Sequence, residues 1–218
     1  MGTSSETAIE SVVKFVKSEL KDAEAGHDWF HIHRVWNLSK IIAKNEKGNL
    51  FIIELGALLH DIADSKFHDG DEHIGPQKAR KFLESLKLEL SVIDHVVKIL
   101  QHISFKGGNF DNGFESPELS IVQDADRLDA MGAIGIARAF HFGGFKNRPL
   151  YDPDILPVLD MSRETYKKSS SPTLNHFHEK LLLLKDRMNT KTGEKIAIER
   201  HRFMVEFLKQ FKSEWNLT

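Results

Sequence analysis

Apolar residues recur at α-helical spacing along most of this chain. Two clear runs are Ile9, Val12, Val13, Val16 and Leu20, then Val35, Leu38, Ile41 and Ile42. Positions three or four apart share one face of a helix, so each run predicts a helix that buries that face. The same pattern predicts helices over approximately 50–61, 75–87, 89–102, 118–141, 173–187 and 194–215. Because the alternation typical of strands is absent from the sequence, we expect an all-α fold.

The length and composition are those of a folded globular chain. It has 218 residues, of which 40% are hydrophobic and 28% charged, enough for a substantial core. We therefore expect one domain spanning 1–218. Gly107, Gly108 and Gly113 predict one loop, and the proline-bearing stretch 143–172 predicts a longer, irregular one.

Charge and residue usage exclude several classes of function. A net charge of -2 gives no general attraction to nucleic-acid duplexes or anionic membranes, so a phosphate site must be built locally. The absence of cysteine excludes disulfides, thiolate metal ligands and a cysteine nucleophile. The chain begins without a basic segment leading into an apolar stretch, and no apolar run approaches the length a bilayer needs. We expect a cytoplasmic protein with no membrane partner.

A His-Asp doublet follows the apolar run that ends at Leu58 and Leu59. Burying the carboxylate of Asp61 without compensation is costly, so it needs a cation or several hydrogen-bond donors. A divalent metal ion would supply the cation, and the imidazole of His60 beside a carboxylate suits a borderline ion. Such a pair also arises by chance, and a helix C-terminus stabilises a protonated histidine. The doublet alone leaves both interpretations open.

Two further segments strengthen the metal hypothesis: "GHDWFHIHRVWNLSK" at 26–40 and "VQDADRLDAMGAIGIARAF" at 122–140. With "LLHDIADSKF" at 58–67, they resemble the HD superfamily of metal-dependent phosphohydrolases. The nearest resemblance is to small bacterial proteins carrying G-H-D-W-x-H-x-x-R-V, L-L-H-D-I-x-D-x-K-F and D-A-D-R-L-D-A-x-G-A-x-G-I-x-R. The segment 175–211 also resembles that subgroup, so the likeness covers nearly the whole chain.

The resemblance implies a single HD-type helical bundle with a C-terminal helical extension. Residues of approximately 20–140 would form the metal-binding core, and 141–218 would complete the pocket. It also implies one divalent ion, with Mn²⁺ preferred and Mg²⁺, Fe²⁺ or Zn²⁺ compatible. The ligands carried over are His31, His60, Asp61 and Asp126.

His33 is the competing candidate within the first motif. Counting back from Arg34 and Val35 places the family histidine at 31, and on a helix residue 33 points well away from it. His27 and Asp28 belong to the same motif, where they would orient a ligand or contact substrate. The alternative for Asp28 is a helix N-cap.

The resemblance implies roles for charged residues near the ligands. Asp64 and Lys66 form a D-x-K element, in which the carboxylate would orient or deprotonate the attacking water and the lysine would hold a phosphate oxygen. For both, a solvated surface charge is the alternative. Arg127 and Asp129 flank Asp126 and are expected to support it.

Five residues in different parts of the chain are predicted to contact the substrate. The candidate substrate-binding residues are His27, Lys106, Arg138, Lys180 and Arg187, although a run of charges is usually a solvated face. Aromatic residues in the irregular loop, with Arg148, are candidates for covering a ligand: Phe142, Phe145 and Tyr151. Those within helical patterns are expected in the core: Trp29, Trp36, Phe177 and Phe203.

A second metal ion is the alternative to a single one. His95 and His102 share a helix face, but they come without the adjacent His-His element of two-metal relatives. We expect one ion.

The function expected from these residues is phosphate hydrolysis. The resemblance implies hydrolysis of a nucleotide, or of another small phosphate ester or anhydride, by a metal-activated water. The alternatives are a non-catalytic metal- or nucleotide-binding sensor module, or a cyclic-nucleotide phosphodiesterase or alarmone hydrolase. All require His31, His60, Asp61 and Asp126 to converge around one cation.

Overall fold

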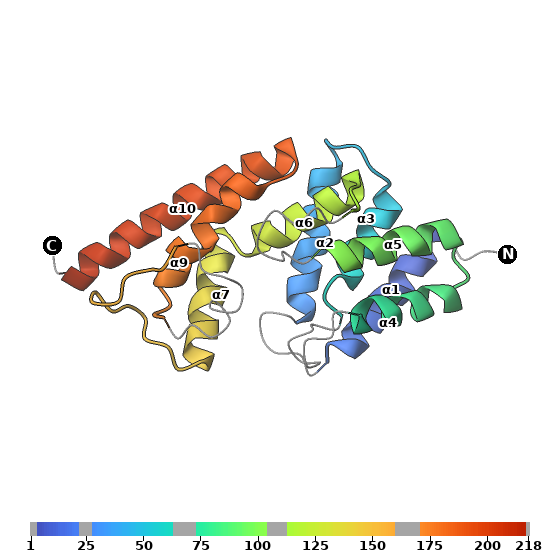
Figure 1. Cartoon of the computed structure of the whole chain (residues 1–218). Coiled ribbons are helices and arrows are strands. Elements are labelled where there is room, and N and C mark those ends of the chain that lie inside the picture. Colours follow the sequence, from blue (N-terminus) through green and yellow to red (C-terminus); the bar gives the residue numbers. More distant parts are fainter. Residues whose placement is uncertain (1–3, 22–27, 63–72, 104–112, 160–170, 217–218) are drawn as a thin grey trace. The chain divides into compact units, whose positions relative to one another are not determined.

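The structure is a computed structural model that describes residues 4–21, 28–62, 73–103, 113–159 and 171–216 (Figure 1). These residues form helices joined by turns, and no strand occurs among them. The all-α prediction is confirmed. None of the helices in these ranges is both long and apolar enough to cross a bilayer.

The described residues fall into two compact units, one up to Ala125 and one from Asp126 onward. Helix α6 (Pro117–Asp129) begins in the first unit and ends in the second. The prediction of one domain over 1–218 stays a prediction.

The first unit is built around α3. Its helices are α1 (Ser5–Glu19), α2 (Trp29–Ala43), α3 (Leu50–Leu59), α4 (Ile74–Ser85), α5 (Leu90–His102) and the first turns of α6. Helix α3 packs against α1, α2 and α5. It is apolar except for Glu54, which accepts a hydrogen bond from Trp36 of α2. Its close approach to α5 depends on Gly56, where an added Cβ would lie 3.3 Å from a methyl carbon of Ile99. These contacts position the end of α3, which His60 directly follows.

Short polar residues begin the helices of this unit. The side chain of Ser4 accepts a hydrogen bond from the Thr7 N–H, that of Asp28 from the His31 N–H, and that of Asn49 from the Phe51 N–H. Each satisfies a backbone donor that has no partner within its helix.

A buried carboxylate anchors the start of α6. Glu118 Oε1 accepts a 2.8 Å hydrogen bond from the Asn49 N–H, and its Oε2 lies 3.3 Å from His95 Nε2. Ser116 caps the helix through the Leu119 N–H and also lies 3.0 Å from His95 Nε2. These contacts tie the first turn of α6 to α3 and α5.

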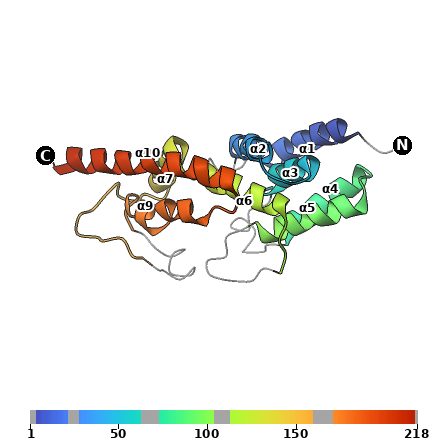
Figure 2. The same cartoon turned by 90° about the horizontal axis from the view of Figure 1, so that it is seen from above.

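The second unit contains a cluster of aromatic side chains, of which Phe177 is buried. It contains the last turn of α6, α7 (Gly132–Phe145), α9 (Asn175–Glu179), the 3-10 helix η2 (Leu181–Arg187) and α10 (Lys191–Asn216). Helix α10 packs along α7 and η2 (Figure 2). A chain of ring contacts joins Phe140, Phe177, Phe207, Phe211, Tyr151 and Trp215.

Three details of the predicted helices are wrong. The helix expected over 118–141 is divided into α6 and α7, because the backbone is extended at Met131 and turns at Gly132, the first residue of α7, with a φ of +69°. The helix expected over 173–187 is the short α9 followed by η2. Phe177 is buried as expected, but Phe203 is 49% exposed on α10.

Candidate metal centre

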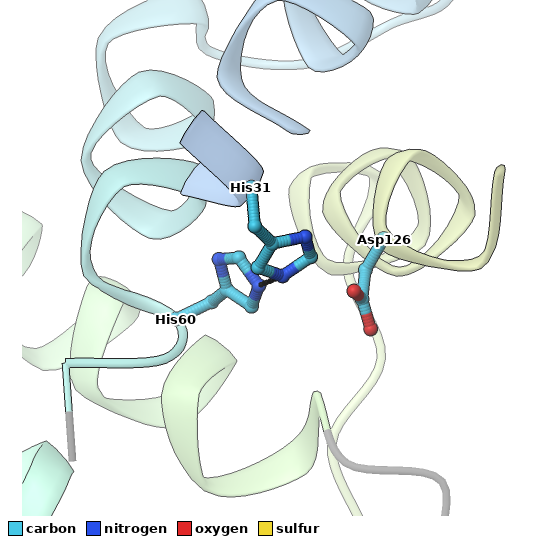
Figure 3. Close-up of side chains that lie close together, drawn as sticks. All are labelled: His31, His60 and Asp126. Atoms are coloured by element: carbon cyan, nitrogen blue, oxygen red, sulfur yellow. Dashed lines mark hydrogen bonds between the residues drawn. The ribbon is translucent and has the colours of Figure 1, made fainter. Parts of the chain in front are cut away.

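Two histidines from packed helices meet at the candidate site. His31 lies in the first turn of α2 and is 1% exposed, and His60 directly follows the last residue of α3. Their Nε2 atoms are 3.2 Å apart (Figure 3). Because α2 and α3 pack closely, this approach follows from the apolar core of the first unit.

Hydrogen bonding fixes the orientation of the His60 ring. Its Nδ1 is 2.9 Å from the carbonyl oxygen of Ala57, which can only accept, so Nδ1 carries the proton. In the neutral ring, Nε2 then has a lone pair on the side of His31 Nε2, where it can accept a hydrogen bond from His31 or bind a cation together with it. Metal-binding histidines are commonly held in this way through their other nitrogen.

The separation of the two nitrogens fits a shared metal ion. With metal–nitrogen bonds of about 2.1 Å, atoms 3.2 Å apart subtend an angle of about 100° at the ion. That angle lies between the values of about 90° for octahedral and about 109° for tetrahedral coordination. The pair can therefore occupy neighbouring coordination positions.

Two carboxylates lie near the histidine rings. Asp126 projects from α6 beside the two rings, and ligand atoms of His31, His60 and Asp126 all lie within 4.8 Å of one another (Figure 3). Asp61 Oδ2 lies 4.0 Å from His31 Nε2. Asp61 is not among the residues whose ligand atoms all lie within 4.8 Å of one another. The structure therefore brings three of the four predicted ligands together and places Asp61 next to one of them, His31.

The donor set suits a divalent cation. Two imidazoles with carboxylates bind Mn²⁺, Fe²⁺ or Zn²⁺ and also accept Mg²⁺, so the residues do not select one ion. His31 is buried, but the side chain of Asp61 is 16% exposed and Asp126 is partly exposed. Ligation by these four residues stays a prediction.

The neighbours of His31 have other positions. His33 is exposed, and its Nε2 lies 3.2 Å from Asn37 Nδ2. It is not part of the group formed by His31, His60 and Asp126. Asp28 caps α2 by accepting a 3.0 Å hydrogen bond from the backbone N–H of His31. The cap thus holds the turn that carries His31.

The residues around Asp126 form contacts within the second unit. Asp129 is 1% exposed, and its Oδ2 accepts a 2.6 Å hydrogen bond from Arg138 Nη1. Arg127 donates to the backbone carbonyl of Arg187. Arg138, predicted to contact substrate, is therefore engaged with Asp129, and its contact with substrate stays a prediction.

The other residues predicted to bind substrate or take part in catalysis lie either in the second unit or outside the described residues. Lys180 and Arg187 are exposed in the second unit. His27, Asp64, Lys66 and Lys106 lie outside the described residues. Their predicted roles stay predictions.

The two other histidines considered as ligands are engaged elsewhere. His95 contacts Ser116 and Glu118, and His102 Nδ1 lies 2.8 Å from the Lys98 carbonyl. Within the part of the chain that the structure describes, the group able to hold an ion together is His31, His60 and Asp126.

Sequence reasoning missed Arg200. Its Nη1 donates to the backbone carbonyl of Leu128, across 72 positions of sequence. Burial lowers the pKa of Arg200, and the charge of Asp129 opposes that shift. A charged residue within a charged helix gives no local sign of such a contact.

Comparisons with known proteins identify the family. The model of the HD domain family matches residues 29–131. The Bacillus subtilis protein YpgQ is 38% identical over 206 residues, which cover 94% of this chain and 92% of YpgQ. A crystal structure of an HD-superfamily hydrolase from Bacillus thuringiensis is 43% identical with a TM-score of 0.80, covering 99% of this chain and all of that one. A crystal structure of YpgQ in complex with ADP superposes with a TM-score of 0.77 at 34% identity, covering 96% of each chain.

Proposed function

This chain belongs to the HD superfamily, and from that premise we propose that it is a metal-dependent phosphohydrolase acting on a nucleotide or another small phosphate ester or anhydride. The observation that carries the proposal is the 3.2 Å approach of the His31 and His60 Nε2 atoms beside Asp126. Two imidazole lone pairs and a carboxylate facing one point form a site for a cation.

The proposed ligands are His31, His60, Asp61 and Asp126, holding one divalent ion, with manganese as the preferred candidate. When bound there, such an ion supplies Lewis acidity toward a phosphoryl oxygen and lowers the pKa of bound water toward neutrality. The chain itself orients the ligands: the Ala57 carbonyl holds the His60 ring, and the Asp28 cap holds the first turn of α2.

Further residues are assigned by their motifs. We assign Asp64 to orienting the attacking water, and Lys66 to binding a phosphate oxygen. His27, Lys106, Lys180 and Arg187 would contact the phosphate chain or the remainder of the substrate. The structure of YpgQ with ADP supports a nucleotide as the ligand class, because the two chains match over nearly their whole length.

Hydrolysis of a nucleotide panel tests this proposal. Purified protein with added Mn²⁺ should release phosphate or pyrophosphate from nucleoside mono-, di- or triphosphates, and product identification distinguishes the two. The panel includes cyclic nucleotides, whose cleavage would favour the phosphodiesterase alternative. We expect His60→Ala and Asp61→Ala to reduce turnover by more than about a hundredfold, beyond the usual cost of losing an outer partner of a metal ligand.

A matched control is His33→Ala, because His33 shares α2 with His31 but lies outside the cluster. It should retain wild-type turnover. If the wild type binds nucleotides tightly but hydrolyses none with Mn²⁺, Mg²⁺, Fe²⁺ or Zn²⁺, the enzyme proposal is wrong and the sensor module is favoured.

A further inference from the structure

The last turn of α6 carries Asp126 and is held from outside the helix by arginine side chains. Arg200 of α10 donates to the carbonyl of Leu128, and Arg138 of α7 donates to the side chain of Asp129. Arg127 reaches outward to the carbonyl of Arg187 at the end of η2. All three contacts lie within four consecutive residues that begin at Asp126.

The contact of Arg200 is a C-terminal cap. The last carbonyls of a helix lack partners within it and carry the negative end of the helix dipole. Leu128 accepts from the Met131 N–H at 3.0 Å and additionally from Arg200, so a cation lies where the dipole favours one. The cap opposes fraying of this turn.

Asp129 adds an electrostatic component. Its carboxylate is 1% exposed, and a carboxylate buried to this extent requires compensating charge. Arg138 supplies it directly at 2.6 Å, and Arg200 interacts with the same charge. The end of α6 is thereby fixed to both α7 and α10.

Gly132 makes room for this arrangement. Its φ is +69°, and a Cβ at this position would lie 3.1 Å from Arg200 Cγ and 3.3 Å from Arg200 Cβ. The aliphatic part of Arg200 therefore passes directly over the glycine. The chain turns sharply at this point, and the guanidinium reaches the helix end as a consequence.

Helix α6 is consequently held at both ends by different means. Glu118 and Ser116 tie its first turn to α3 and α5, and the arginines hold its last turn. Asp126 lies in the turn held by arginines, one helical turn before the capped end. The direction of its carboxylate depends on whether that turn keeps its helical geometry.

We propose that Arg200 is a positioning residue for the metal centre: by capping the last turn of α6 and facing Asp129 together with Arg138, it holds Asp126 where it can share a cation with His31 and His60. This inference rests on the proposed metal-binding function. It assigns to α10 a part in metal binding that does not involve touching the ion. Arg138 takes part as the second cation of the same network.

The test measures Mn²⁺ binding directly. Arg200→Met keeps most of the aliphatic stem and removes the guanidinium, and it should weaken Mn²⁺ binding in calorimetric titrations by roughly tenfold, the lower range for partners of metal ligands. Arg200→Lys retains a cation and should recover part of that affinity. The matched control is Arg202→Met, which removes an exposed arginine two positions along α10 and should bind Mn²⁺ as the wild type does.

Hydrogen exchange separates this inference from the proposed function. In metal-free protein, Arg200→Met should accelerate amide exchange in residues 126–131, and Arg202→Met should not. Circular dichroism establishes that each variant is folded; if Arg200→Met does not fold, Arg138→Met tests the same network.

Wild-type affinity together with unchanged exchange in the folded variant would overturn the role of Arg200 while leaving the phosphohydrolase proposal intact. Failure of the wild type to bind any of the four divalent ions would instead refute the proposed function. The assignment of Arg200 to a metal centre would then fall as well, even with accelerated exchange.

Discussion

The two sides of the candidate metal centre are held by different forces. His31 and His60 project from α2 and α3, whose neighbouring residues Ile32, Leu58 and Leu59 are at most 1% exposed. Asp126 projects from a helical turn whose fixed contacts involve arginine side chains. Both sides have buried apolar neighbours, since Ala125 and Leu128 on α6 are also 0% exposed. The aspartate side differs in that contacts of arginine side chains are added to this packing.

This difference has consequences for how each side responds to change. Apolar packing scales with buried area and responds little to ionic strength. Contacts between charged groups weaken with salt to the extent that they are accessible to solvent, and the side chain of Arg138 is 25% exposed. We expect the histidine side to fail mainly through cavities and the aspartate side through loss of charge or of close approach.

Leu58→Ala is expected to have the largest effect on stability. Leu58 is fully buried in α3, and truncating a buried leucine costs about 2–5 kcal/mol through lost apolar burial and the cavity left behind. Urea unfolding should show this loss with little dependence on added salt. Leu50→Ala, at a position 50% exposed on the same helix, is the control and should cost far less. Equal losses in the two variants would contradict a tightly packed α3.

Gly132→Ala tests the aspartate side of the metal centre, with a smaller expected loss of stability. An alanine there must adopt a positive φ and also push against Arg200, which should cost about 1–2 kcal/mol. Because Arg200 must move, Mn²⁺ binding should weaken along with stability. Gly144→Ala is the control in the same helix, since an added Cβ meets nothing within 4 Å, and it should be neutral or slightly stabilising. Unchanged Mn²⁺ affinity in a destabilised Gly132→Ala variant would separate the glycine from the metal centre.

The same contrast explains which features could be predicted from sequence. The helices of the first unit follow from local apolar periodicity, because α1, α2 and α5 each bury a face against α3, and α4 packs against α5. The end of α6 at Asp129 was missed, since the apolar pattern continues across Gly132 and the positive φ becomes apparent only with the backbone. Periodicity describes packing well and turns poorly.

The candidate site shows a similar division. His60 and Asp61 could be predicted as candidate ligands from the residues alone, because a charged pair directly follows an apolar run. Grouping them with His31 and Asp126 depended on resemblance to a family. Arg200 was missed because its contact with Leu128 depends on how α10 packs, 72 positions away. A long-range hydrogen bond from a surface-type residue leaves no periodic pattern.

Lowering the pH should sharpen the contrast by weakening the second unit. Burial, with the charges of Lys180 and Arg148, lowers the pKa of His176 from 6.5 to about 3. The unfolded chain therefore takes up a proton near pH 6.5 that the folded chain refuses until about pH 3, so this contribution to stability is complete above pH 6.5 and declines as the pH falls below it. In urea unfolding of metal-free protein, the wild type should lose about 1 kcal/mol more than His176→Gln between about pH 7 and pH 5.5. The dependence should be reduced rather than abolished, because burial also lowers the pKa of His178. A His176→Gln profile that follows the wild-type profile would show that His176 takes up its proton equally in both states.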